Sequence, residues 1–412
     1  MKIAVFTQFY PPEMEPSGFM FESFSTFLSK QDEIEVVDVL CGFPNFPEGK
    51  FLDGSWKSLF NTKIVNGVRI NYVFVIPSNN KSNFKRIINY TSYLVSSFLK
   101  GLVIKKPDVI VATSPPIFAA LSGLLVAKIK GSKFVLDVRD IWPESAVQMG
   151  SIKHPFIISL LEKLELFLYR NSSLITVATP GMVQLVKNKL EDVDIPIEYV
   201  PCGVTIPESK ALSKSIHSPF FEKDKGKSCV LYAGLHGHAQ NLTTLIDAAK
   251  ILEHRDDIVF YFVGAGPDKD RVTEYAKELD LTNVRFISPV TRETIRQFFV
   301  HSTCAIVPLR DLDIFKNVFP SKTFELMSYG VPSVVGVGGE IEKIIISSGA
   351  GQAVSPECAS EYAEAIVKFV DQPEYRKLVS ERAIKTAKEQ FDYDVVNKRF
   401  ANLVIKLLSG SE

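Results

Sequence analysis

The chain has 412 residues, 46% of them hydrophobic, and its 47 Lys and Arg residues balance 47 Asp and Glu residues, so the formal net charge is zero. This length and composition are typical of a globular protein with two domains, and the neutral charge argues against a nucleic-acid-binding protein. The five cysteines form no C-x-x-C pair, which argues against a disulfide framework or a zinc site. The N-terminal segment lacks the apolar region and cleavage site of a secretory signal, so we expect a cytoplasmic protein.

The first half of the chain alternates short β-branched runs with amphipathic stretches. Strands covered on both faces are predicted for KIAVFTQ, IEVVDVL, VRINYVFV, DVIVATS, KFVLDVR, SLITVAT and IEYVPC. Helices are predicted between several of them, as in SGFMFESFSTFLSK and HPFIISLLEKLELFLYRN. Residues 109–127 form an uncharged run, which we interpret as a strand, a Pro-Pro loop and a helix rather than a membrane span.

The second half repeats this alternation after a polar, Lys-rich stretch at 205–227 that predicts a linker. Its predicted strands are SCVLYAG, IVFYFVGAG, VRFISPV, CAIVPL, SVVGVGG and GQAVSP, and the chain then ends in helices. The β-α-β alternation predicts an α/β fold with two doubly wound parallel sheets. We expect one domain at 1–205, completed by a C-terminal helix at about 390–412, and a second domain at 206–389.

The most informative stretch is 317–340, NVFPSKTFELMSYGVPSVVGVGGE. Ser321 after Pro320 is a good helix N-cap, and Gly330 ends the helix after about two turns. Beyond the next strand, Gly338 and Gly339 would let the backbone approach a ligand closely.

Two charged residues lie in the first part of this predicted helix. A helix N-terminus binds anions, and Lys322 adds a positive charge there. Glu325 can accept hydrogen bonds from the two adjacent hydroxyls of a ribose, each worth about 1.5–3 kcal/mol. The residues alone leave open an ordinary capped helix with a solvated glutamate.

This stretch resembles the donor-binding motif of the retaining GT-B glycosyltransferases of family 4. The likeness is to the bacterial O-antigen, capsule and colanic-acid enzymes, in particular the L-fucosamine-transferase-like subgroup, through P-S-K-x-x-E-x-M-x-x-G-x-P. The resemblance covers nearly the whole chain. It implies two Rossmann-like domains facing across a cleft, a nucleotide diphosphate sugar donor whose ribose binds Glu325, and retention of anomeric configuration. Many members have a glutamate at the position of Asn317 that binds the sugar.

Further stretches match the resemblance in chain order. In the second half, LYAGLHGHAQNL resembles a glycine loop beside the donor phosphates, and FVGAGPDKDRV resembles a turn near the nucleotide. VRFISPV resembles the segment whose main chain contacts the base. In the first half, QFYPPEMEPSG resembles a loop that closes over the diphosphate. The loop GFPNFPEGK at 42–50 is also typical of the subgroup. The implied donor site comprises Gly18, Gly234, Gly237, His238, Gly264, Gly266, Val290, Arg310, Pro320, Ser321, Lys322, Glu325, Gly338 and Gly339.

The segment DVRDIWPES at 137–145 is the part of the first domain most typical of the subgroup. Asp140 or Glu144 would orient the acceptor hydroxyl or receive its proton, although a helix cap explains Asp140 equally well. Lys322 is the third catalytic candidate, because a preorganised cation stabilises the leaving diphosphate. Asp311-Leu312-Asp313 has metal-binding spacing but lies in a predicted loop. We therefore expect no metal and no cofactor.

Residues 81–106 combine lysines with aromatic residues, a pattern typical of a helix at an anionic membrane surface and equally of a domain helix with solvated lysines. We predict transfer of an N-acetylated amino or deoxy sugar from a nucleotide donor, UDP favoured over GDP, to a lipid-linked saccharide in O-antigen or capsule synthesis. The protein would be cytoplasmic and peripheral on the inner membrane. The alternatives are a UDP-N-acetylglucosamine 2-epimerase and a non-catalytic nucleotide-sugar-binding protein.

Overall fold

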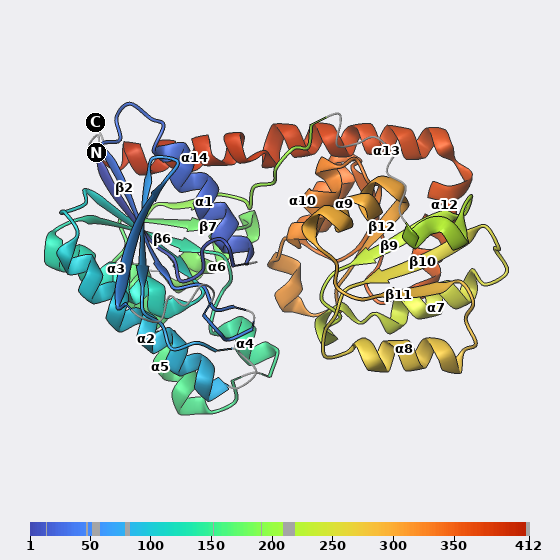
Figure 1. Cartoon of the computed structure of the whole chain (residues 1–412), viewed down its shortest axis with the longest axis horizontal. Coiled ribbons are helices and arrows are strands. Elements are labelled where there is room, and N and C mark those ends of the chain that lie inside the picture. The colour runs from blue at the N-terminus through green and yellow to red at the C-terminus, as the bar shows by residue number, and fades with distance from the viewer. Residues whose placement is uncertain are drawn as a thin grey trace. The chain divides into compact units, whose positions relative to one another are not determined.

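The computed structural model describes residues 1–13, 15–46, 48–51, 58–78, 83–150, 152–190, 192–208 and 219–408. The chain divides into two compact units (Figure 1). The first comprises Met1–Gly203 and Tyr393–Glu412, and the second comprises Val204–Asp392.

The first unit is built on a sheet that has the strand order β3-β4-β2-β1-β5-β6-β7-β8 in the described residues. All neighbouring strands are parallel except β3 and β4. Asn66 and Gly67 join these two strands, and both have positive φ (52° and 79°), as a type I′ hairpin turn requires. The strands are β1 (Lys2–Phe6), β2 (Val36–Gly42), β3 (Phe60–Val65), β4 (Val68–Val73), β5 (Val109–Ser114), β6 (Lys133–Val138), β7 (Leu174–Val177) and β8 (Ile197–Tyr199).

Helices cover both faces of this sheet. Alternate residues of a strand point to opposite sides, so each strand contributes to two buried clusters. Ile3 and Val5 of β1 pack in one buried cluster with α1 and α14, whereas Ala4 and Phe6 pack in another with α3, α5 and α6. The helices are α1 (Pro16–Leu28), α2 (Asn83–Val103), α3 (Ile117–Lys130), α4 (Glu144–Gln148), α5 (Pro155–Arg170), α6 (Pro180–Lys189) and α14 (Tyr393–Lys406).

The uncharged run 109–127 forms β5 and the start of α3, as predicted. Within the described part of the chain, no helix is long and apolar enough to cross a membrane.

The C-terminal helix α14 is part of the first unit's core. Its Phe400 stacks on Phe24 of α1, with ring centroids 4.1 Å apart, and Val396 and Val404 are buried in the same cluster. The last segment of the chain therefore returns to pack beside the first strand and helix.

The second unit contains an all-parallel sheet with the order β11-β10-β9-β12-β13-β14. Its strands are β9 (Ser228–Ala233), β10 (Ile258–Val263), β11 (Val284–Ile287), β12 (Ser302–Pro308), β13 (Ser333–Gly336) and β14 (Gly351–Ala353). Its α-helices are α7 (Thr243–Ile251), α8 (Lys269–Glu278), α9 (Arg292–His301), α10 (Ser321–Ser328), α11 (Glu340–Ser348), α12 (Ala359–Asp371) and α13 (Pro373–Thr386). Shorter turns are the 3-10 helices η3 (Pro219–Asp224), η4 (His238–Gln240) and η5 (Asp313–Asn317) and the π-helix η6 (Ala387–Phe391).

The π-helical turn η6 supports helix α10 from within the second unit. Phe391 stacks on Phe324 of α10, with ring centroids 4.0 Å apart and an interplanar angle of 22°. Both rings are almost fully buried. The position of α10 therefore depends on residues directly before the chain leaves this unit.

Each sheet reverses its direction of strand addition beside its first strand, between β1 and β5 in one unit and between β9 and β12 in the other. Ligands of doubly wound sheets bind outside the carboxyl ends of the strands at such a switch point. The loops after β1 and β5, and those after β9 and β12, are therefore where each unit is expected to bind a ligand. The predicted fold class of two Rossmann-like parallel sheets is confirmed.

Candidate functional site

The loop after β9 and the start of α10 meet at the switch point of the second unit. The Lys322 ammonium donates a hydrogen bond to the carbonyl of Ala233, the last residue of β9. A Cβ atom on Gly234 would overlap that ammonium. Gly234 is therefore a glycine because the lysine side chain occupies the space beside its Cα.

The environment of Lys322 lowers the pKa of its ammonium group. The residue as a whole keeps contact with solvent, but its ammonium lies against the backbone of the loop after β9. Desolvation there lowers the pKa of Lys322 to about 8, and the nearby charge of Glu325 only partly offsets this effect. A bound anion would restore the cationic form, because an opposite charge favours it.

Helix α10 begins one residue earlier than predicted. Pro320, not Ser321, is its N-cap residue and offers no side-chain cap, since proline has no side-chain acceptor. Gly330 ends the helix as predicted: its φ is 64°, its N–H donates to Met327 O at 2.9 Å and the next N–H donates to Leu326 O at 3.0 Å, which is a Schellman motif. The helix has 8 residues, in agreement with the predicted two turns.

Glu325 lies three residues after Lys322, which places both side chains on one face of α10. Glu325 belongs to the second turn of the helix rather than to the first. The side chain is half-buried. Among the described residues its carboxylate has no hydrogen-bond or ion-pair partner, so it is free to accept hydrogen bonds from a ligand's hydroxyl groups.

The predicted G-x-G turn after β10 contacts the glycine loop itself. A Cβ on Gly264 would overlap Gly234 O, and a Cβ on Gly266 would overlap the His236 backbone. The His236 N–H donates to Ala265 O at 2.9 Å. These two glycines therefore let the loops after β9 and β10 interlock, which is an indirect role in shaping a ligand site.

His236 is a buried histidine that the predicted site omitted. It is 0% exposed, and within the described residues neither ring nitrogen has a hydrogen-bond partner. Burial, and then the positive charges of Lys269 and Lys322, lower its pKa to about 4, so the imidazole is neutral at physiological pH. The L-H-G-H sequence gives no signal as to which histidine points inward.

His238 and Gly237, both predicted to bind the donor, form the turn that follows. His238 is exposed, and its Nδ1 lies 3.2 Å from an oxygen of the buried Asp268. Arg271 binds the same carboxylate with two hydrogen bonds of 2.7 Å and is the main cause of the lowered pKa of Asp268. The Gly237 N–H donates to the side chain of Gln240 at 3.2 Å.

The remaining predicted donor residues lie after other strand ends of this unit. Arg310 follows β12, donates its N–H to Ala239 O at 2.9 Å, and has its guanidinium 3.8 Å from Glu357. Val290 is partly buried beyond the end of β11.

Gly338 and Gly339 follow β13. A Cβ on Gly339, whose φ is 84°, would overlap the Lys316 backbone, so chain packing alone explains this glycine. Beside Gly338 the nearest atom to an added Cβ, a carboxylate oxygen of Glu342, is 3.9 Å away. Only Gly338 therefore leaves room for a ligand.

Gly18 belongs to the first unit, in the first turn of α1. The N–H groups of Ser17 and Gly18 donate to the Glu15 carboxylate at 2.8 Å and 3.3 Å, and a Cβ on Gly18 would lie 3.2 Å from Phe9 O. The anion position at this helix N-terminus is held by Glu15. A diphosphate would have to displace that carboxylate to use the predicted contact.

Asp140 follows the end of β6 and accepts a hydrogen bond from the Ser145 hydroxyl at 2.6 Å. Burial raises its pKa, and the hydrogen bonds from Ser145 and the Ile141 N–H partly offset this effect. The N-cap residue of α4 is Pro143, so the helix-cap interpretation of Asp140 is wrong. A carboxylate with a raised pKa after a strand end is a suitable proton acceptor.

Glu144, the other acidic candidate, is exposed at the start of α4. Its carboxylate accepts a hydrogen bond from Gln148 at 3.3 Å and lies 3.6 Å from the Lys189 ammonium. Of the two predicted acids, Asp140 has the environment better suited to proton transfer.

Sequence reasoning missed two buried carboxylates of the first unit. Asp137 is fully buried, binds Arg139 through two hydrogen bonds of 2.6 Å and accepts another from the Thr176 hydroxyl of β7 at 2.7 Å. Glu13 is 2% exposed, accepts hydrogen bonds from the N–H groups of Asn45 and Phe46 at 2.8 Å and 2.9 Å, and has its pKa raised by burial to about 7. Asp137 belongs to a strand that was predicted to be covered on both faces, whereas no pattern in the sequence around Glu13 signals burial.

Comparisons with known proteins show which proteins this chain is similar to. Residues 213–386 match the family described as Glycosyl transferases group 1. The probable glycosyltransferase WbjE of Pseudomonas aeruginosa is 25% identical over 321 residues, which cover 75% of this chain and 77% of WbjE. The putative colanic acid biosynthesis glycosyl transferase WcaI of Escherichia coli K12 is 24% identical over 422 residues, with 98% and 99% of the two chains covered.

This chain is a glycosyltransferase. Solved structures show its fold: sucrose-phosphate synthase from Thermosynechococcus elongatus superposes with a TM-score of 0.76 at 14% identity, with all of both chains covered. Anabaena HepE in complex with UDP and glucose superposes with a TM-score of 0.70 at 15% identity, with 98% of this chain and all of HepE covered. The glycosyltransferase therefore has the GT-B fold.

The aromatic residues predicted at a membrane surface on α2 mostly face inward in the glycosyltransferase. Tyr93 is 0% exposed and its hydroxyl donates to Leu40 O at 2.7 Å, and Phe98 packs against a buried cluster. The outward side of α2 has aliphatic residues, such as Val95 and Leu99, each 51% exposed. Tyr93 and Phe98 therefore do not contribute to an exposed basic and aromatic surface, and Phe84 lies outside the residues whose side chains the structure describes.

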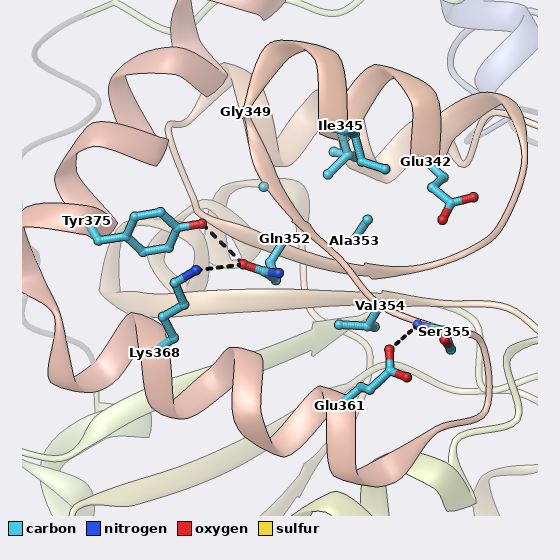
Figure 2. A pocket seen from close by; sticks show the side chains of 12 residues that line it. Glu342, Ile345, Gly349, Gln352, Ala353, Val354, Ser355, Glu361, Lys368 and Tyr375 are labelled. Atoms are coloured by element: carbon cyan, nitrogen blue, oxygen red, sulfur yellow. Dashed lines mark hydrogen bonds between the residues drawn. The ribbon is translucent and has the colours of Figure 1, made fainter.

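A pocket of about 450 Å³ lies beside β14, between α11 and the helices α12 and α13 of the glycosyltransferase (Figure 2). Gln352 of β14 accepts hydrogen bonds there from Tyr375 at 3.2 Å and Lys368 at 3.5 Å. None of the predicted site residues lines it. No cluster of three or more metal-ligating side chains occurs in the residues that the structure describes.

Proposed function

We propose that this glycosyltransferase transfers an N-acetylated amino or deoxy sugar from a UDP-linked donor to a lipid-linked saccharide at the inner membrane surface, in the synthesis of O-antigen, capsule or a related surface polysaccharide. The relative WcaI is named for colanic acid biosynthesis, and HepE was solved with UDP and glucose. Both support the class of donor and product.

One observation within the second unit supports the proposal most directly. The Lys322 ammonium lies against the loop after β9, and the unpartnered carboxylate of Glu325 lies one turn further along the same helix face. The ammonium and the N-terminus of α10 would bind the diphosphate, and the carboxylate would accept hydrogen bonds from the ribose. This pairing of one cation with one free acceptor suits a nucleoside diphosphate.

In the proposed reaction the bond between the sugar's anomeric carbon and the diphosphate oxygen breaks as the acceptor oxygen attacks from the same face. The acceptor proton passes to the leaving diphosphate, and the configuration is retained. Lys322 stabilises the charge that develops on the leaving group; removing one such donor typically costs about 3–4 kcal/mol in the barrier. Asp140 orients the acceptor hydroxyl. We propose that the reaction needs no metal ion and no cofactor.

Thermal-shift measurements with UDP, GDP, dTDP and ADP test the donor site. We expect UDP to stabilise the wild-type protein, by about 2.7 kcal/mol at 100 times its dissociation constant. Glu325→Gln and Lys322→Met should each weaken this effect, whereas Lys343→Met, an exposed lysine of α11 paired with Glu340, should not. If UDP stabilises the Glu325 and Lys322 variants as strongly as the wild type, the site is elsewhere.

Incubation of the wild-type protein with UDP-sugars, with and without a lipid-linked acceptor, separates the possible activities. A transferase consumes the donor in proportion to the acceptor. Conversion of the donor alone to its epimer would instead identify an isomerase, and binding without any turnover would identify a sensor. Either of those results would overturn the proposal.

A further inference from the structure

Glu13 connects two loops of the first unit that follow neighbouring strands. It belongs to the loop after β1, and its carboxylate accepts hydrogen bonds from the Asn45 and Phe46 N–H groups in the loop after β2, at 2.8 Å and 2.9 Å. β1 and β2 are parallel neighbours, so both loops lie at the carboxyl ends of the strands, where doubly wound sheets bind ligands. The carboxylate is therefore placed to fix one of these loops relative to the other.

Asn45 extends this connection to a third segment of the chain. Its side-chain amide donates to Phe43 O at 3.0 Å, and its side-chain oxygen accepts from the Ser78 N–H, after β4, at 3.2 Å. Glu13 and Asn45 are only 2% and 4% exposed. Both side chains thus hydrogen-bond to backbone groups of neighbouring loops, which defines the course of residues 43–46.

Phe46 is the residue of this loop that reaches the surface. Residues 43–45 are buried, whereas Phe46 is partly exposed. Its ring lies 5.5 Å from the ring of Phe9, at an interplanar angle of 56°, and Phe9 is 9% exposed, so the inner ring supports the outer one. Sites for small molecules combine aromatic side chains with a few placed polar groups, and the C–H face of a sugar ring packs against such an aromatic ring.

We propose that Glu13 is a positioning residue of the acceptor site, which holds residues 43–46 so that the Phe46 ring packs against a sugar ring of the saccharide acceptor. The proposal rests on the proposed function in that the acceptor is a saccharide. Glu13 touches no reacting atom and acts through the backbone of the loop after β2. A variant that keeps its hydrogen-bond acceptor should therefore keep acceptor binding.

The charge of Glu13 should change how firmly it holds this loop. Titratable groups of three elements interact with it electrostatically: Glu15 at the start of α1, Cys41 of β2 and Tyr72 of β4. None of the three is a cation that could balance an ionised Glu13. Burial raises the pKa of Glu13 to about 7, so ionisation above this pH opposes the folded position of the loop.

Saturation-transfer NMR of the full-length protein tests the proposal with the methyl glycosides of N-acetylglucosamine, glucose and galactose, in the presence of UDP. We expect the wild type to bind at least one of these probes at about pH 6. Glu13→Ala and Phe46→Ala should each weaken this binding by about fivefold or more. Glu13→Gln keeps an oxygen that accepts the two N–H groups and should restore it. The matched control is Phe156→Ala, which removes a phenylalanine of α5 that is 72% exposed and should leave binding unchanged.

The pH dependence gives a second readout that loss of stability alone would not produce. Binding by the wild type should weaken by about threefold or more as the pH rises from about 6 to 8.5, whereas Glu13→Gln should show less of this loss. Amide hydrogen exchange at Asn45 and Phe46 should be faster in Glu13→Ala and at the wild-type rate in Glu13→Gln. If Glu13→Ala does not fold, Phe46→Ala and the pH dependence of Glu13→Gln still test the proposal.

Four results would overturn this role of Glu13. The wild type could bind none of the three probes, or Phe46→Ala could bind them as the wild type does. Binding by Glu13→Gln could be as weak as by Glu13→Ala, or Glu13→Ala could lose binding without faster exchange at Asn45 and Phe46. Stabilisation by UDP, measured without any sugar, depends on the second unit and tests the proposed function independently of these outcomes.

Discussion

Lys322 and Gly234 form a pair in which the smaller residue makes room for the larger one. Because an added Cβ on Gly234 would overlap the ammonium rather than any backbone atom, the lysine side chain is what must move in a substituted protein. The expected consequence is a change in ligand binding, in addition to the backbone strain of a side chain at a φ of 159°.

We therefore predict that Gly234→Ala weakens UDP binding by about tenfold and also lowers the free energy of unfolding by about 1–3 kcal/mol, because residues with a Cβ rarely adopt a φ of 159°. Titration calorimetry and urea denaturation measure the two quantities. If the effect passes through Lys322, the double variant Gly234→Ala/Lys322→Met binds UDP no more weakly than Lys322→Met alone. Additive losses would show that Gly234 acts in another way.

The buried Glu13 should make stability depend on pH. Its pKa in the folded protein, about 7, lies above the ordinary value of 4.5, so the folded state binds the proton more tightly than the unfolded state. This contribution is present at low pH and is lost as the pH rises from about 4.5 through 7. Glu13→Gln keeps the oxygen that accepts the N–H groups of Asn45 and Phe46 but cannot ionise.

The variant should therefore gain stability relative to the wild type as the pH rises from about 5 to 8, by up to about 3 kcal/mol. Urea unfolding curves at a series of pH values measure the difference. A stability difference that stays constant across this range would contradict a buried, ionising Glu13.

Sequence motifs were a good guide to residues with a local role and a poor guide to residues with a distant partner. The position of Lys322 at the start of a helix follows from the proline before it and the glycine after it. Glu13 is covered by the loop that contains Asn45, and His236 is covered by the loop that contains Gly266. Both loops are remote in sequence from the residue that they cover. No spacing within their own segments signals such contacts.

At the scale of elements, α10 shows how local signals define a helix. Gly330 stops it with a φ of 64°, and an added Cβ there would lie 2.7 Å from Ser380 Oγ and 2.8 Å from Ile384 Cδ1 on α13. The glycine thus serves both the backbone conformation and the packing of α10 against α13.

We predict that Gly330→Ala destabilises the second unit by about 2 kcal/mol or more, of which about 1–2 kcal/mol is the conformational cost of positive φ. Gly226→Ala is the matched control, because Gly226 has a φ of 87° and nothing within 4 Å of an added Cβ. Chemical denaturation should show a larger loss for Gly330. Equal losses would mean that crowding against α13 contributes nothing.

The parallel strands were predictable because they are buried on both faces and therefore form continuous apolar runs. β3 was missed for the opposite reason: five of its six residues, FNTKIV, are exposed, so it has no apolar face to detect. The exact first residue of α10 could not be predicted from the sequence either, since Ser321 and Pro320 both suit a helix N-terminus. Only the backbone geometry distinguishes them.

At the scale of the whole molecule, two phenylalanines near the end of the chain belong to different cores. Phe391 packs on Phe324 in the second unit, and Phe400 packs on Phe24 in the first. The boundary between the units, at residues 392 and 393, falls between them.

We predict that Phe400→Ala destabilises the first unit by about 3–5 kcal/mol and Phe391→Ala the second by a similar amount. Hydrogen exchange followed by peptide should show faster exchange in β1 and α1 for the first variant and in α10 and β13 for the second. Only Phe391→Ala should weaken UDP binding. If both variants loosen the same unit, the division of the chain given above is wrong.

The support that η6 and Phe391 give to α10 has a consequence for how this protein can be shortened. The family match ends at residue 386, just before the π-helical turn. A fragment cut there would keep every predicted donor residue of the second unit, yet it would leave Phe324 without its stacking partner and the first sheet without α14. Such a fragment should fail to bind UDP although all of the residues proposed to contact the nucleotide in that unit are present.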